Sequence, residues 1–126
     1  MSHSDYVLNS RSALGALFEK LGSIPEKIVI IVDDDNRVMG TITDGDIRRT
    51  LTKTTGDLTS LTITEIMNTE FVFDWDDDLA GNKSSFSPAV KIIPVIDRDG
   101  FLKFLRREEV KEFMIGDTKV SDQSPA

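Results

Sequence analysis

The chain has 126 residues, enough for one compact domain or for two small ones that share a core. Its formal net charge of −7 argues against nucleic acid or an anionic membrane as the main partner, because both require a basic surface. It contains no Cys, which excludes a disulfide, a zinc–thiolate site and a thiol nucleophile and agrees with a cytoplasmic location, and no apolar run approaches the roughly 20 residues that span a bilayer.

The first half of the chain reads as strand, helix, strand, strand and helix. Apolar positions in its first helix recur at helical spacing, and Asn9 or Ser10 is the expected cap. The run from Ile28 to Val32 is rich in β-branched residues, which is typical of a strand covered on both faces. The predicted elements are a strand at 6–8, a helix from its cap to about Leu21, a strand at 28–32, a strand at 38–42 and a helix at 44–51.

The second half repeats this order after a polar connector and a short linking helix at 63–67. Asp99-Gly100 indicates a tight hairpin turn. The first helix of this half is expected to be short or irregular, because it contains Gly, Asn, Ser and Pro. The predicted elements are a strand at 71–73, a helix at 79–89, a strand at 92–96, a strand at 101–105 and a helix at 106–115.

The two halves are copies of one unit. Lys27 to Asp33 matches Lys91 to Asp97, each a lysine, an apolar run and an aspartate before a hairpin. Neither copy can bury both faces of a three-stranded sheet alone, so we predict an α+β fold in which two β-α-β-β-α repeats pack sheet to sheet with pseudo-two-fold symmetry. The expected boundaries are 5–60 and 61–115, with a flexible C-terminal tail at 116–126.

One motif in the first copy, from Gly40 to Arg49, points to a ligand. An apolar strand runs into Thr43-x-x-Asp46, and a helix begins at once. The turn presents a hydroxyl, a carboxylate, free backbone N–H groups and two arginines, which are the groups that a ribose and a phosphate need. A capping box, in which Thr43 and Asp46 only satisfy the helix terminus, is the structural alternative, and the two roles are compatible.

The repeated unit and the string from Gly40 to Asp46 resemble a tandem pair of cystathionine-β-synthase (CBS) domains, also called a Bateman module. The longer string through Arg49, followed by Ile66-Met67-Asn68, is similar to CBS pairs attached to sugar-phosphate nucleotidyltransferases. The resemblance implies a regulatory module that binds AMP, ADP, ATP, S-adenosylmethionine or a related adenosyl ligand and catalyses nothing itself. It further implies a homodimer through the helices and a fused or separate nucleotidyltransferase domain as partner.

The resemblance also implies where the ligand binds. In the first site, the ribose would contact Thr43 and Asp46, and the second copy would supply the base and phosphate contacts. Lys91 is the first choice for a phosphate contact and Arg48 the second. The residues expected at this site are Thr43, Asp46, Arg48, Thr69, Phe71, Val90, Lys91 and Ile92.

The second site departs from the motif. Arg106 stands where Thr43 stands in the first copy, and Glu109 stands in place of Asp46. Arg106 would partly fill a ribose pocket, so we expect this site to be degenerate, with Lys27 and Glu26 lining it.

The sequence is compatible with two other functions. A structural module that mediates oligomerisation, with vestigial sites, is the main alternative. An enzyme is a distant third, because the chain offers no Cys and only His3. The aspartate runs at 33–35 and 74–78 are interpreted as a hairpin turn and a helix cap, so no metal site is expected.

Overall fold

A computed structural model describes residues 3–53, 60–78, 91–107 and 114–115. The predicted helix at 79–89 and the tail at 116–126 lie outside these residues. The described elements of the first copy are η1 (His3–Tyr6), β1 (Val7–Asn9), α1 (Leu14–Ser23), β2 (Ile28–Val32), β3 (Val38–Thr43) and α2 (Asp44–Lys53). Those of the second copy are α3 (Ile63–Ile66), β4 (Asp74–Trp75), β5 (Ile92–Ile96), β6 (Leu102–Arg107) and β7 (Met114–Ile115).

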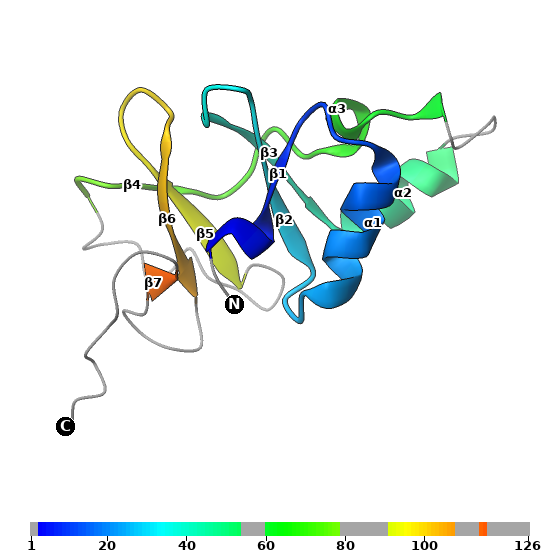
Figure 1. Cartoon of the computed structure of the whole chain (residues 1–126), viewed down its shortest axis with the longest axis horizontal. Helices are drawn as coiled ribbons and strands as arrows, with labels where there is room; N and C mark the ends of the chain where they lie inside the picture. The colour runs from blue at the N-terminus through cyan, green and yellow to red at the C-terminus, as the bar shows by residue number, and fades with distance from the viewer. Residues whose placement is uncertain (1–2, 54–59, 79–90, 108–113, 116–126) are drawn as a thin grey trace.

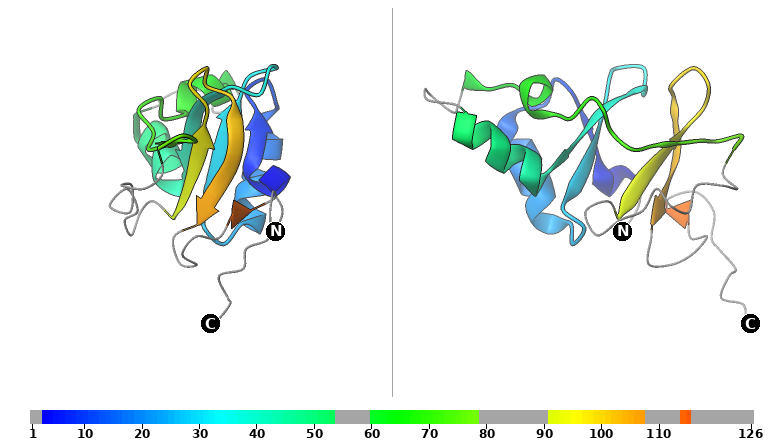
Figure 2. Two further views of the ribbon diagram at one scale, coloured as in Figure 1. Left: turned by 90° about the vertical axis from the view of Figure 1, so that its left-hand side faces the viewer. Right: turned by 180° about the vertical axis from the view of Figure 1, so that it is seen from behind.

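The strands form two sheets with matching topology. In the first sheet the order is β1-β2-β3, with β1 parallel and β3 antiparallel to β2. In the second the order is β4-β5-β6-β7, and β4 and β6 flank β5 in the same senses. The sheets lie face to face, and α1 and α2 cover the outer side of the first sheet (Figures 1 and 2). This confirms the predicted α+β fold of two repeats packed sheet to sheet.

The central strands explain why the two copies need each other. All five residues of β2 and all five of β5 are buried, as their apolar sequences require. The main core cluster joins Ile30 and Ile31 to Ile92 and Leu105 of the second sheet. Each such side chain contributes about 1.5–3 kcal/mol when it leaves water, so the interface between the sheets is a main source of stability.

The same hairpin occurs in both copies. In the first, Asp33 Oδ1 accepts the backbone N–H groups of Asp35 and Arg37, both at 2.9 Å. In the second, Asp97 Oδ1 accepts those of Asp99 and Phe101, again at 2.9 Å. The left-handed position is filled by Asn36 (φ 71°) in one turn and by Gly100 (φ 93°) in the other, which are residue types that tolerate it.

The two hairpin tips bind each other at one end of the molecule (Figure 1). Val38 N–H donates to the Gly100 carbonyl at 3.0 Å, and Leu102 N–H donates to the Asn36 carbonyl at 3.0 Å. Between these bonds Arg37 pairs with Phe101, and its guanidinium lies 4.6 Å from the centre of that ring. The reciprocal bonds are a direct expression of the pseudo-two-fold symmetry.

The segment that links the copies crosses the first sheet at Gly40. Thr41 and Asn68 exchange backbone hydrogen bonds of 3.1 and 2.8 Å. A Cβ on Gly40 would lie 2.8 Å from the Asn68 carbonyl oxygen and 3.0 Å from Met67 Sδ. The glycine of the motif is therefore required by this close approach of two backbones.

Three predicted boundaries are wrong. α1 begins at Leu14 because the Asn9 side chain and carbonyl accept the N–H groups of Arg11 and Ser12, which closes a turn where the helix was expected. The strand expected at 71–73 lies instead at Asp74–Trp75. The helix expected at 106–115 is contradicted at both ends, since Arg106 continues β6 and Met114–Ile115 form β7 against it. Among the described residues, no helix has the length and apolar character needed to cross a membrane.

Candidate functional site

A pocket of about 430 Å³ lies at the ends of the strands opposite to the hairpin tips. Both copies and the segment between them contribute to it. β2 begins there with Ile28, β3 ends there with Thr43, and β5 begins there with Ile92. The lining residues are Glu26, Lys27, Ile28, Thr41, Thr43, Asp44, Gly45, Asp46, Arg48, Arg49, Asn68, Phe71, Val72 and Ile92.

Thr43 and Asp46 form a reciprocal cap at the start of α2. The Thr43 backbone N–H and hydroxyl donate to Asp46 Oδ2 at 2.9 and 3.1 Å. The Asp46 N–H donates to Thr43 Oγ1 at 3.2 Å. This is the capping geometry weighed as the structural alternative, and it fixes the Asp46 carboxylate at the pocket wall with little freedom to rotate.

The other oxygen of Asp46 faces a cation. Oδ1 forms an ion pair with Nη2 of Arg49, one helical turn further along α2. The Asp46 side chain is only 7% exposed, whereas that of Arg49 is 65% exposed. The carboxylate is thus a buried and capped group, and the guanidinium is an exposed partner.

The charges of the pocket are balanced. Its described lining has three basic side chains (Lys27, Arg48 and Arg49) and three acidic ones (Glu26, Asp44 and Asp46). Asp44 and Gly45 begin α2, where backbone N–H groups have no intrahelical partner and the helix dipole is positive. An anion is therefore favoured beside the helix terminus.

An apolar wall forms part of the pocket lining. It consists of Ile28 and Ile92 from the two central strands and Phe71 and Val72 from the linking segment. The Phe71 ring is held against Phe73, with ring centres 5.6 Å apart. A flat heterocycle can lie against this wall, while a sugar reaches Asp46.

The structure brings together five of the eight residues expected at the first site: Thr43, Asp46, Arg48, Phe71 and Ile92. Of the other described residues expected there, Thr69 and Lys91 are exposed and do not line the pocket. Val90 lies outside the described residues. Lys27 and Glu26, expected at the second site, line this pocket instead, because the turn before β2 brings them beside Thr43.

The second copy has a buried ion pair one residue before the place of the motif threonine. Arg107 pairs with Ile92 as Thr43 pairs with Ile28, so Arg107 and not Arg106 is the structural counterpart of Thr43. Arg106 extends from β6 and binds Oδ2 of Asp74 in β4, whose side chain is 0% exposed. Burial raises the pKa of the Asp74 carboxyl, and the Arg106 guanidinium opposes this rise. Among the described residues, Asp74 Oδ1 has no hydrogen-bond partner. Glu109 lies outside the described part of the chain.

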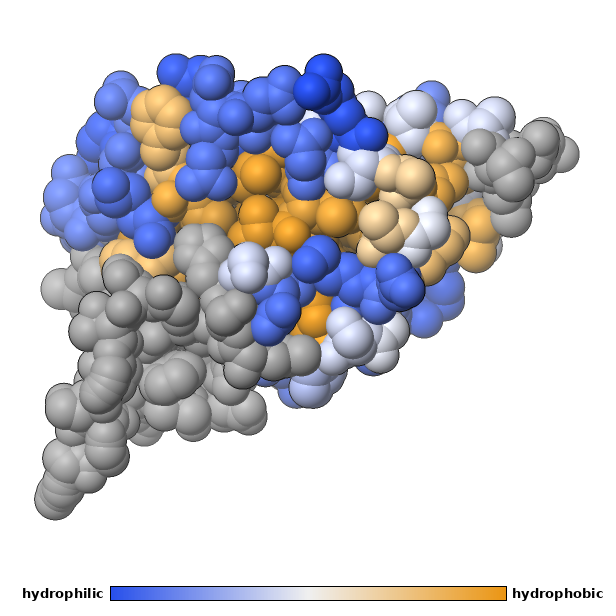
Figure 3. Space-filling view, viewed as in Figure 1, coloured by the Kyte–Doolittle hydropathy of each residue, from blue (hydrophilic) through white to orange (hydrophobic). Residues whose placement is uncertain are grey.

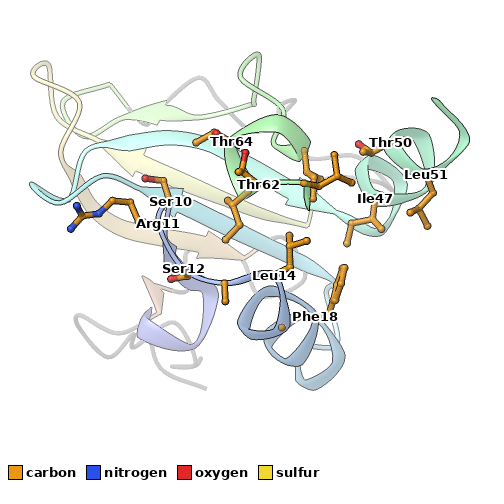
Figure 4. Close-up of a pocket in the computed structure, with 15 residues that line it drawn as sticks. Ser10, Arg11, Ser12, Leu14, Phe18, Ile47, Thr50, Leu51, Thr62 and Thr64 are labelled. Atoms are coloured by element: carbon orange, nitrogen blue, oxygen red, sulfur yellow. Dashed lines mark hydrogen bonds between the residues drawn. The ribbon is translucent and has the colours of Figure 1, made fainter. Parts of the chain in front are cut away.

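A second, larger pocket lies between the helices, away from Asp46. It measures about 1040 Å³, and Leu14, Phe18, Ile47 and Leu51 point into it, whereas Arg11 points away (Figure 4). Phe18 and Leu51 are 49% and 43% exposed. Apolar side chains also gather on the face of the molecule seen in Figure 3.

Sequence reasoning missed several residues of the Asp46 pocket. Arg49 carried a usable signal, because a cation three residues after an acid on a helix meets it on the same face. Asn68 and Val72 carried none, since their position depends on where the linking segment crosses β3.

No model of a known protein family matches the chain. An uncharacterized protein of Chlamydia pneumoniae is 35% identical over 74 residues, which are 56% of this chain and 22% of that protein. The chain therefore corresponds to a minor part of that relative.

Solved structures share the fold. A CBS domain protein of Streptococcus pneumoniae has a TM-score of 0.67 and is 17% identical over 82% of this chain and 73% of that chain. CBSX2 in complex with AMP has a TM-score of 0.59 and is 18% identical over 86% of each chain. CbpB in complex with c-di-AMP has a TM-score of 0.69 and is 15% identical over 82% of this chain and 71% of that chain. The chain thus has the fold of a pair of CBS domains.

Proposed function

We propose that the chain is a regulatory module that binds an adenine nucleotide or a related adenosyl ligand in the Asp46 pocket. The observation that carries the proposal is the fixed Asp46 carboxylate, in a pocket that is also lined by apolar side chains and by the first residues of α2. Ribose hydroxyls would donate to Asp46, the base would lie between Ile28, Phe71 and Ile92, and phosphate would meet the start of α2 and Arg48. The structures of similar fold that hold AMP and c-di-AMP support this ligand class.

Calorimetric titration tests the proposal. We expect one of AMP, ADP, ATP, S-adenosylmethionine or c-di-AMP to bind with a dissociation constant below about 100 μM, equivalent to roughly 5.5 kcal/mol. The bound ligand should be recovered unchanged, since the module is proposed to act by binding alone. Absence of binding by all five would contradict the proposal.

The Asp46→Asn variant tests the proposed ribose contact most directly. The amide carbonyl can still accept the Thr43 cap, but the amide nitrogen is a donor and cannot accept a ribose hydroxyl. We expect at least a tenfold loss of affinity with little change in thermal stability. Asp35→Asn at the exposed hairpin tip is the matched control and should bind normally.

The groove between the helices favours a second role, a homodimer through α1 and α2. Its half-exposed Phe18 and Leu51 would leave water when a second copy covers it. Phe18→Asp should shift the molecular mass measured by light scattering from dimer to monomer, because the charge would be buried. Thr52→Asp, one residue beyond Leu51 and outside the groove, is the control.

The regulated partner is proposed to be a sugar-phosphate nucleotidyltransferase domain, fused or separate. The support is the string from Gly40 to Arg49 and its resemblance to modules attached to such enzymes. Ligand would act by shifting the angle between the two copies, which a tethered domain senses. A partner whose activity does not change with ligand would contradict this assignment.

A further inference from the structure

Arg49 lies on the wall between two neighbouring pockets. Asp46, Arg49 and Asn68 line both the Asp46 pocket and a pocket of about 390 Å³ that also contains Lys53 and Glu65. Because the Arg49 side chain is 65% exposed, it has room to leave Asp46 without unfolding the helix. The carboxylate, 7% exposed and capped by Thr43, stays in place.

The hydrogen-bond capacity of Asp46 limits what else can bind there. A carboxylate oxygen has two lone-pair sites. Oδ2 already accepts two bonds from Thr43, so only Oδ1 remains, and one of its sites holds Arg49. A ribose with free 2′ and 3′ hydroxyls brings two donors. Arg49 and the complete diol therefore exclude each other at Asp46.

We propose that Arg49 makes the pocket select phosphorylated adenine ligands over the uncharged nucleoside, because the ribose displaces Arg49 from Asp46 and the ligand's phosphate takes the released guanidinium. The inference rests on the proposed function and assigns to Arg49 the role of a specificity-determining residue. A nucleoside removes the partner of Arg49 and offers none in return. A phosphate replaces it with a charge-assisted pair of matching geometry.

The test compares AMP with adenosine on the Arg49→Met variant. Methionine keeps the helix propensity and removes the cation. Adenosine should bind about fivefold more tightly than to the unaltered chain, because Asp46 Oδ1 is then free, whereas AMP should bind about tenfold more weakly. Preference for AMP should fall about fiftyfold.

The gain for adenosine separates this role from simpler ones. If Arg49 were only a phosphate contact, adenosine affinity would not change, and the inference would be overturned. If Arg49 only stabilised the start of α2, both ligands would bind more weakly and the melting temperature would fall, which would overturn it as well.

Two control variants sharpen the result. Arg48→Met removes the neighbouring pocket cation, which does not pair with Asp46 in the described structure, so AMP should weaken and adenosine should show no gain. Arg98→Met removes an arginine paired with Asp77 outside the pocket and should affect neither ligand. If neither AMP nor adenosine binds the unaltered chain, this inference is overturned, and the proposed function fails with it only if ADP, ATP, S-adenosylmethionine and c-di-AMP do not bind either. If AMP binds in an Asp46-dependent way but Arg49→Met gives no gain for adenosine, only the inference fails.

Discussion

Gly40 is a position where the fold leaves no room for a side chain. A methyl group there would lie 2.8 Å from the Asn68 carbonyl oxygen. Neither backbone can move away easily, because Thr41 and Asn68 are joined by two backbone hydrogen bonds. We expect Gly40→Ala to lower the free energy of unfolding by about 1–3 kcal/mol. Gly22→Ala in α1 is the matched control: nothing lies within 4 Å of its added Cβ, so it should stabilise the protein by up to about 1 kcal/mol. Urea denaturation measures both, and equal effects would contradict the explanation.

Asp74 makes the stability depend on pH. Burial raises the pKa of its carboxyl above the ordinary value of 3.8, so the folded protein holds this proton more tightly than the unfolded chain. The stability contributed by the protonated group is complete below about pH 3.8 and is lost as the pH rises through the raised pKa. Asp74→Asn does not titrate.

Relative to the unaltered chain, the Asp74→Asn variant should therefore be more stable at about pH 7 than at about pH 3.5. The quantity compared is the free energy of unfolding of the variant minus that of the unaltered chain. Urea denaturation at the two pH values measures the difference. The opposite order would mean that the ion pair with Arg106 outweighs the burial of the carboxylate.

The two hairpins have the same shape, so the equivalent aspartates should contribute equally to the free energy of unfolding. Asp33 and Asp97 each accept two backbone N–H groups in turns of the same shape. We expect Asp33→Ala and Asp97→Ala each to lower the free energy of unfolding by about 1–3 kcal/mol, within experimental error of each other. Asp35→Ala removes only an exposed ion pair and should have an effect below about 1 kcal/mol. A large difference between the first two would show that only one hairpin carries the structure.

The central strands and the hairpins could be predicted from the sequence because their signals are local. β2 and β5 are continuous apolar runs, and Asp99-Gly100 specifies its own turn. The start of α1 could not, since the side chain of Asn9 closes a turn that competes with the helix. Arg106 aligns with Thr43 in the sequence, yet the strand register pairs Arg107 with Ile92 as it pairs Thr43 with Ile28. Arg106 therefore lies one residue earlier on β6, where Asp74 accepts its guanidinium.

Some residues of the candidate site could be predicted from a local motif, and others depend on how the two copies pack. Thr43 and Asp46 belong to one short motif, and their geometry follows from the cap that they form. Lys27 is expected at the second site but lines the Asp46 pocket, because sequence order does not show which cleft a strand end faces. Its placement depends on the packing of the two copies, as does that of Val72 and Asn68.

In the whole molecule, the hairpin tips join the copies at one end of the strands (Figure 1). The residues that line the Asp46 pocket lie at the opposite ends of these strands. If the proposed ligand binds in the Asp46 pocket, its contacts with both copies would change the angle between them while the tips remain in contact. The tips would then act as a hinge, because their few hydrogen bonds can bend without breaking, whereas the buried strands are too closely packed to deform.

A disulfide across the tips tests this arrangement. Arg37 and Phe101 face each other as an antiparallel pair flanked by the two reciprocal hydrogen bonds, where Cα atoms lie about 4.5 Å apart and suit a disulfide. The chain has no Cys of its own, so Arg37→Cys with Phe101→Cys gives a single possible bridge. Oxidation should raise the free energy of unfolding by about 2–4 kcal/mol.

The disulfide should leave the nucleotide affinity within about twofold of that of the reduced variant. If the tips stay in contact with and without ligand, the bridge stabilises both states equally and does not change the free energy of binding. Calorimetric titration of the oxidised and reduced forms of the same variant measures this, and the reduced form controls for the loss of the Arg37–Phe101 contact. A tenfold loss of affinity on oxidation would mean that the tips separate when ligand binds, and the hinge would then have to lie in the linking segment where Asn68 bonds Thr41.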